Sequence, residues 1–249
     1  MDLGVACEHG GAEEAGPYVA GWLAALRGVS PTDVEGEAEA LLKRMEAQKG
    51  LARVIDNPLL LRLAVSVYDR RVQKEAEETE ALPRNRAALY AQYVTGVAWE
   101  RAERRTPSPP DQEQVLEALE VMAWELMGGE RTRGELADRL REEMAELEGP
   151  HAMVDFSREA LGLLAAYDAA ADPHLAFAHL TFREYFVARR LERAWEVNPD
   201  AVWKILGPRL HLDAWREPLL LLAGGLEDAS PLVKRVLRAD SPCERLLHR

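Results

Sequence analysis

One histidine in this sequence has neighbours that suit ligand binding. His179 follows a short alternating apolar segment, 175–178, and precedes residues whose apolar side chains recur at helical spacing. We predict a strand-to-helix junction there, with Thr181 as the N-cap and Glu184 completing a capping box. Free backbone N–H groups and the helix dipole favour anions at such a terminus. His179 is therefore a candidate anion contact; the alternative is a histidine that satisfies a backbone group and serves packing only.

A second candidate stands where a leucine-rich helix begins. Asn57 is a good N-cap, and Pro58 suits the first turn because its missing N–H would have no partner there. Leu59 opens an apolar run that predicts a buried helix to about Arg71. Many helices begin with Asn-Pro for structural reasons alone, so Pro58 and Leu59 need a further reason to be assigned to a site.

Both segments resemble one family. The run 177–186 resembles the Phe-x-His-x-Thr/Ser-Phe-Gln-Glu-Tyr/Phe signature near the end of the winged-helix part of NACHT proteins, which are signalling nucleotide-binding switches of the STAND class. Arg183 stands where that family usually has glutamine, and we expect it on the solvent face. Residues 57–61 resemble the Asn-Pro-Leu-Leu-Leu motif of the small helical domain that closes a NACHT nucleotide site, and 82–105 resemble the helix that follows.

The resemblance implies a set of ligands and partners. It implies that His179 touches the β-phosphate of ADP, that Pro58 packs on the adenine ring and that Leu59 is a neighbouring apolar contact. It further implies ADP-held autoinhibition, opening on exchange for ATP, oligomerisation of the parent protein and, in prokaryotes, often a defence role. The partner it implies for this chain is an upstream P-loop NTPase core.

The predicted fold class is mainly α, with a helical bundle, a winged-helix domain with a small β wing, and the start of a second helical domain. Five residues, Thr-Pro-Ser-Pro-Pro at 106–110, mark the clearest boundary because this proline density breaks any helix. We therefore predict a disordered or truncated edge, a small helical domain, a winged-helix domain and a further helical segment, over residues 1–16, 17–105, 106–196 and 197–249.

Glycine, proline and capping residues set the predicted helices. A helix from Pro17 should stop at Gly28, and a second should run from Pro31 to Gly50. Thr132 with Glu135 predicts another capping box. The remaining predictions are a helix ending at Gly128, a third winged-helix helix from Ser157 that buries Leu161, Leu164 and Ala165, a strand over 175–178, and helices from Pro199, Trp215 and Pro231.

Charge and cysteine content exclude several classes of protein. The formal net charge is −12 and no basic tract exceeds two residues, which argues against nucleic acid or an anionic membrane as partner. The longest strongly apolar run, 218–223, is too short to span a bilayer. Two distant thiols, Cys7 and Cys243, predict no disulfide framework and fit a reducing cytoplasm. Cys7-Glu8-His9 has no second ligand pair, so we expect no metal site.

Missing motifs limit the chemistry. The sequence contains no Gly-x-x-x-x-Gly-Lys-Ser/Thr run and no apolar segment ending in paired acids, so we predict no catalytic residue and no ATP hydrolysis by this chain alone. Two alternatives stay open. One is a DNA-binding winged-helix regulator that reads bases with residues 157–167. The other is a helical protein-interaction scaffold with no nucleotide role.

Overall fold

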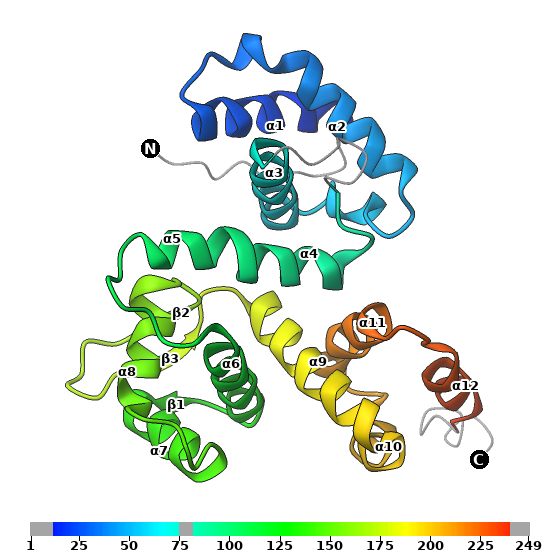
Figure 1. The fold of residues 1–249 in the computed structure, drawn as a ribbon. Coiled ribbons are helices and arrows are strands. Elements are labelled where there is room, and N and C mark those ends of the chain that lie inside the picture. Colours follow the sequence, from blue (N-terminus) through cyan, green and yellow to red (C-terminus); the bar gives the residue numbers. More distant parts are fainter. Residues whose placement is uncertain (1–11, 75–81, 240–249) are drawn as a thin grey trace. The chain divides into compact units, whose positions relative to one another are not determined.

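The computed structural model describes residues 12–74 and 82–239 (Figure 1). The protein is mainly α-helical with one small antiparallel sheet, which confirms the predicted fold class. Within the described ranges, no helix combines the length and the apolar character that crossing a bilayer would need. The chain divides into two compact units, Met1–Val97 and Ala98–Arg249. The Cys7-Glu8-His9 segment and Cys243 lie outside the described residues.

In the first unit, α1 packs on both α2 and α3, and α3 contacts α4. The largest fully buried side chains between these helices are leucines together with Met45 and Tyr68. Short 3-10 turns precede α2 and α3, and a π-helical turn continues α4 toward the second unit. The bounds are α1 Ala12–Arg27, α2 Glu35–Ala47, α3 Pro58–Gln73 and α4 Arg86–Gln92, with turns at Pro31–Asp33, Ala52–Val54 and Tyr93–Ala98.

The predicted helix boundaries at Gly28 and Asn57 are correct, whereas the second helix covers Glu35–Ala47 and does not run from Pro31 to Gly50. Gly28 ends α1 with a φ of 69°, a conformation that glycine adopts without strain. Asn57 caps α3 by accepting a hydrogen bond from the Leu60 N–H at 3.1 Å. The predicted start of α1 at Pro17 is wrong. The helix begins at Ala12 and includes Pro17, because the alanines and glutamates before Pro17 are strong helix formers.

The second unit places four α-helices and three short strands before its longest described helix, α9. The order of elements is α5 Trp99–Glu103, α6 Gln112–Met127, β1 Arg131–Thr132, α7 Arg133–Glu143, α8 Pro150–Asp155, a π-helical turn Phe156–Ala160, β2 Leu164–Ala166, β3 His174–Phe177, α9 Leu180–Val197, α10 Pro199–Leu206, α11 Arg216–Gly225 and α12 Ser230–Arg238, with 3-10 turns at Gly207–Arg209 and Asp213–Trp215. Helices α6, α10 and α11 all pack on α9.

The sheet has the antiparallel order β1-β3-β2, with Leu164 opposite Phe177 and Arg131 opposite Leu175. Its order along the chain is helix, strand, two helices and a two-stranded wing, an arrangement related to the helix-turn-helix. The sequence predicts the wing but not β1, because a strand of two residues carries no periodic pattern. Thr132 ends β1 and caps α7, and the predicted capping box with Glu135 is present.

The third helix of this group differs from the prediction. It begins at Pro150, and Ser157, the expected N-cap, is buried in the π-helical turn that continues it, with its hydroxyl donating to the Met153 carbonyl at 2.9 Å. Gly162, with a φ of 69°, follows the helix, and Leu164–Ala166 form β2 instead of a helix. A recognition helix over residues 157–167 is therefore wrong.

Candidate functional site

His179 is the N-cap of α9 itself. The chain leaves β3 at Phe177, and His179 keeps an extended backbone with φ −145° and ψ 137° before the helix begins at Leu180. The Thr181 N–H donates to Nδ1 of His179 at 3.4 Å, and the Thr181 hydroxyl lies 3.0 Å from the same nitrogen. The predicted Thr181 cap is therefore wrong, because the imidazole of His179 takes the place of a capping oxygen two residues earlier.

This cap fixes which nitrogen of His179 can donate. A neutral imidazole has one N–H donor and one acceptor nitrogen, so a ring that accepts at Nδ1 carries its proton on Nε2. The side chain is exposed at the surface of the second unit. The cap therefore presents an oriented Nε2–H donor to solvent at the N-terminus of an 18-residue helix.

Two neighbours of His179 differ from the sequence predictions. Glu184 is buried within α9, whose N-cap is His179 and not Thr181. Arg183 is half-buried rather than on the solvent face, and its Nη1 donates to the Leu126 carbonyl at 3.1 Å. Leu126 lies in the last turn of α6, where carbonyls have no partner within the helix and a cation is favourable. Arg183 therefore connects the start of α9 to the end of α6.

Pro58 and Leu59 lie at the start of α3 in the first unit. Pro58 is exposed at the first helical position and Leu59 is half-buried, while Leu60 and Leu61 behind them belong to the core. The Tyr18 hydroxyl donates to the Pro58 carbonyl at 3.4 Å. The exposed proline ring is an apolar surface available to a planar partner. His179 belongs to the other unit, so the convergence of the three residues on one nucleotide stays a prediction.

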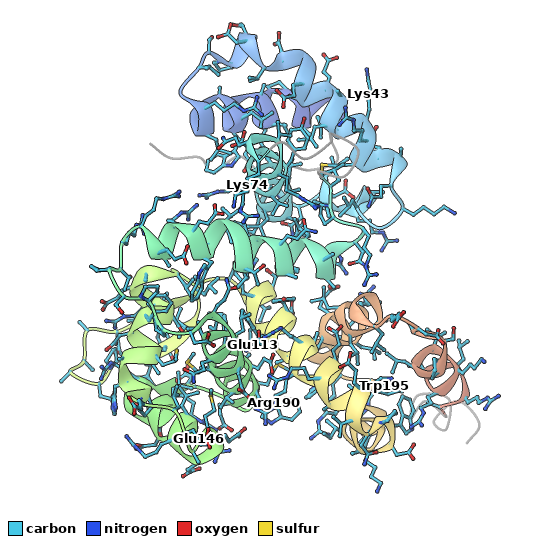
Figure 2. All side chains as sticks on the ribbon, in the orientation of Figure 1. Lys43, Lys74, Glu113, Glu146, Arg190 and Trp195 are labelled. Atoms are coloured by element: carbon cyan, nitrogen blue, oxygen red, sulfur yellow. The ribbon has the colours of Figure 1, made fainter. Side chains whose placement is uncertain are left out.

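A charged cluster between α6 and α9 was not predicted from the sequence. Glu120 is 3% exposed, and its two oxygens accept from Arg189 at 2.7 Å and Arg193 at 3.0 Å. Arg189 also binds Glu113 at 2.8 Å and Arg193 binds Glu117 at 3.3 Å. Figure 2 labels Glu113 and the neighbouring Arg190, which lie on the two helices that form this cluster.

Burial has the largest effect on the pKa values of Glu120 and Tyr185 in this region. Burial raises the pKa of Glu120 to about 7, although Arg189 and Arg193 act in the opposite direction. Burial likewise raises the pKa of Tyr185 in the adjoining turn of α9. A hollow of about 320 Å³ lies beside the cluster, lined by charged residues and a few apolar ones: Glu117, Glu120, Val121, Glu143, Met144, Arg190, Arg193, Ala194 and Val197. Because its carboxylates and guanidiniums already bind one another, the cluster joins two helices and offers no free nucleophile.

The cluster did leave a signal in the sequence. Glu113, Glu117 and Glu120 recur at the spacing of one helix face, and Arg189 and Arg193 do the same on α9. Each pattern by itself is typical of a solvated face. The two faces become a buried seam only when α6 and α9 pack together, and that packing cannot be read from either helix alone.

In the described part of the chain, no group of three or more His, Cys, Asp or Glu side chains is arranged to hold a metal ion. At the wing turn, His174 Nδ1 and Asp168 Oδ2 lie 2.6 Å apart, and this contact raises the pKa of His174 and lowers that of Asp168. This pair closes the β2–β3 turn, since the Asp168 carboxylate also accepts from the His174 N–H at 3.3 Å. Comparison of the chain with family models, curated proteins and solved structures finds no match.

Proposed function

We propose that this chain is the regulatory lid portion of a NACHT-type signalling NTPase, which helps to hold ADP in a closed state and opens when ATP replaces it. The observation that carries the proposal is that the exposed His179 caps α9 by accepting the Thr181 N–H at Nδ1, which leaves an Nε2–H as its donor. A phosphate oxygen accepting from that N–H would form a charge-assisted hydrogen bond, worth about 1.5–3 kcal/mol. Such a contact with ADP but not ATP would bias a two-state switch.

Pro58 and Leu59 support the same proposal from the first unit. An exposed proline above a leucine-rich helix start is an apolar surface of the kind that a nucleobase contacts. The partner would be a P-loop NTPase core, which would bind the triphosphate and magnesium and carry out hydrolysis. The setting would be cytoplasmic, the opened parent protein would self-associate, and in a prokaryote the role would be defence.

The proposal is tested by two substitutions of His179 in the parent protein. His179→Ala removes both the cap and the imidazole donor, whereas His179→Asn keeps a side chain that caps helices well. If the imidazole holds ADP, both variants release ADP faster than wild type, by roughly tenfold or more, because a bond worth about 1.5–3 kcal/mol is lost. If the His179→Asn variant retains ADP as wild type does, His179 serves only to cap α9 and the proposal is wrong.

Thermal unfolding of the present chain supplies the control. His179→Ala should lower stability by about 1 kcal/mol through loss of the cap, while His179→Asn should not. An ADP defect shared by both variants, with a stability defect in only one, separates ligand contact from folding.

A further inference from the structure

Two helices of the first unit bring aromatic, proline and arginine side chains to one face. The Tyr18 hydroxyl of α1 reaches the Pro58 carbonyl of α3 at 3.4 Å. One turn further along α1, Trp22 Nε1 donates to Ser66 Oγ at 3.3 Å. Residues four apart on a helix lie on the same side, so Tyr18 and Trp22 form one row and Pro58 and Arg62 form the row beside it.

Arg62 is held in place without an ion pair. Its guanidinium carbon lies 4.1 Å from the centroid of the Trp22 ring, and the side chain is exposed. Among the residues that the structure describes, no carboxylate binds Arg62, whereas the Arg27 guanidinium on the same pair of helices binds both Glu37 and Asp69. Stacking on an indole leaves the N–H edge of a guanidinium open and lowers the entropy lost when that edge binds an anion.

We propose that Arg62, stacked on Trp22, contacts a phosphate of the nucleotide whose base lies against Pro58 and Tyr18. This inference rests on the proposed function and adds a phosphate contact in the first unit. A nucleotide joins a planar ring to an anion, and this face offers an apolar and aromatic surface with an unpaired cation one helical turn, about 6 Å, away. Since the chain carries a net charge of −12, an anion needs such a fixed local cation to be attracted.

The indole N–H of Trp22 provides a direct reporter. Trp22 is the one tryptophan of the six in the sequence that belongs to the first unit, and its ring touches the guanidinium. In the full chain labelled with 15N-tryptophan, Trp22→Phe assigns its indole signal. Titration with ADP to millimolar concentration should shift that signal saturably. Adenosine, which lacks phosphate, should bind more weakly by about tenfold or more, because the charge-assisted contact is missing.

Substitution of Arg62 tests the assignment. Arg62→Gln should weaken ADP binding by roughly tenfold and leave adenosine binding unchanged, because it removes the charge alone. Arg62→Lys keeps the charge without the planar fork and should give an intermediate affinity. Arg71→Gln is the matched control, since it removes an arginine of the same helix α3 more than two turns away from Arg62 and should bind ADP as wild type does.

The outcomes of these experiments separate failure of the Arg62 assignment from failure of the proposed lid function. Equal ADP affinity in wild type and Arg62→Gln, or equal affinity for ADP and adenosine, overturns the role of Arg62. If His179→Ala weakens ADP binding in that same case, the proposed function still holds. If millimolar ADP changes no indole signal, the phosphate contact of Arg62 is overturned, whereas the proposed lid function is decided separately by ADP release from His179→Ala in the parent protein. Folding is checked by circular dichroism and thermal unfolding of each variant, which should match those of wild type, because the other five tryptophans lie in the second unit and do not report on the first.

Discussion

The buried carboxyl of Glu120 should make the second unit less stable as pH rises toward neutrality. Its pKa is raised from 4.5 to about 7, so the folded chain holds a proton that the unfolded chain has already lost between these values. The contribution of Glu120 to stability is therefore fully present below pH 4.5 and is lost as the pH rises through about 7. Glu120→Gln stays neutral at every pH and should remove this dependence.

The size of the effect follows from the same two values. At about 1.4 kcal/mol for each pKa unit, the interval from 4.5 to about 7 corresponds to about 3 kcal/mol between acid and neutral solution. The opposing slope comes from carboxylates such as Asp155, whose pKa is lowered by Arg133 and whose contribution is lost as the pH falls through its lowered pKa. Comparing wild type with Glu120→Gln at each pH cancels that background.

Urea unfolding followed by tryptophan fluorescence measures the difference. Five of the six tryptophans belong to the second unit, so the signal reports mainly on the unit that contains Glu120. The free energy of unfolding of wild type relative to Glu120→Gln should fall by about 2–3 kcal/mol between about pH 5 and about pH 8. Glu196→Gln, which removes an exposed carboxylate on α9, should run parallel to wild type. A pH-independent difference would mean that Arg189 and Arg193 outweigh burial and keep Glu120 ionised, which would refute the reasoning.

Two further predictions concern the first unit. Asn57→Ala should destabilise it by about 1 kcal/mol because the Leu60 N–H loses its acceptor. Asn57→Asp keeps a capping oxygen and should be as stable as wild type. Thermal unfolding followed by circular dichroism checks both variants. Gly50→Ala should cost about 1–3 kcal/mol because its Cβ would lie 2.2 Å from the Arg84 carbonyl oxygen. Gly36→Ala, with nothing within 4 Å of its Cβ, should be neutral or stabilising by up to about 1 kcal/mol, and equal effects of the two alanines in urea unfolding would contradict this account.

Local chemistry explains which parts of the fold could be predicted. Gly28, Asn57 and the Thr132–Glu135 pair each act on the backbone within one turn, so their effects are visible in a short sequence window. The sequence predicts that the third helix starts at Ser157 and includes Leu164 and Ala165, whereas the helix starts at Pro150 and these two residues lie in β2. A short apolar run fits a buried helix or a buried strand equally well, and only pairing with β3 decides between them.

Contacts between elements explain what could not be predicted. Arg183 looked like a surface residue because its neighbours alternate between apolar and charged, yet the end of α6 supplies a carbonyl acceptor 57 positions away in sequence. The pattern around Glu120 likewise predicts a solvated side chain, but in the structure α9 covers it and Arg189 and Arg193 bind its carboxylate. Trp22 and Arg62 carry no motif that relates them, and their stacking depends on how α1 packs on α3.

The cap of α9 gives the strongest reason to look for a ligand there. Asn, Asp, Ser and Thr are the preferred N-cap residues, and Thr181 was available two positions later, yet His179 holds the cap with a hydrogen bond as long as 3.4 Å. A sequence selected for helix stability alone would place a capping oxygen at this position, and local rules are broken most often where function requires it. Asparagine would restore a stronger cap but would not present the outward imidazole N–H. A substitution that stabilises the helix and yet speeds ADP release by roughly tenfold or more is therefore the result that a binding role for His179 requires.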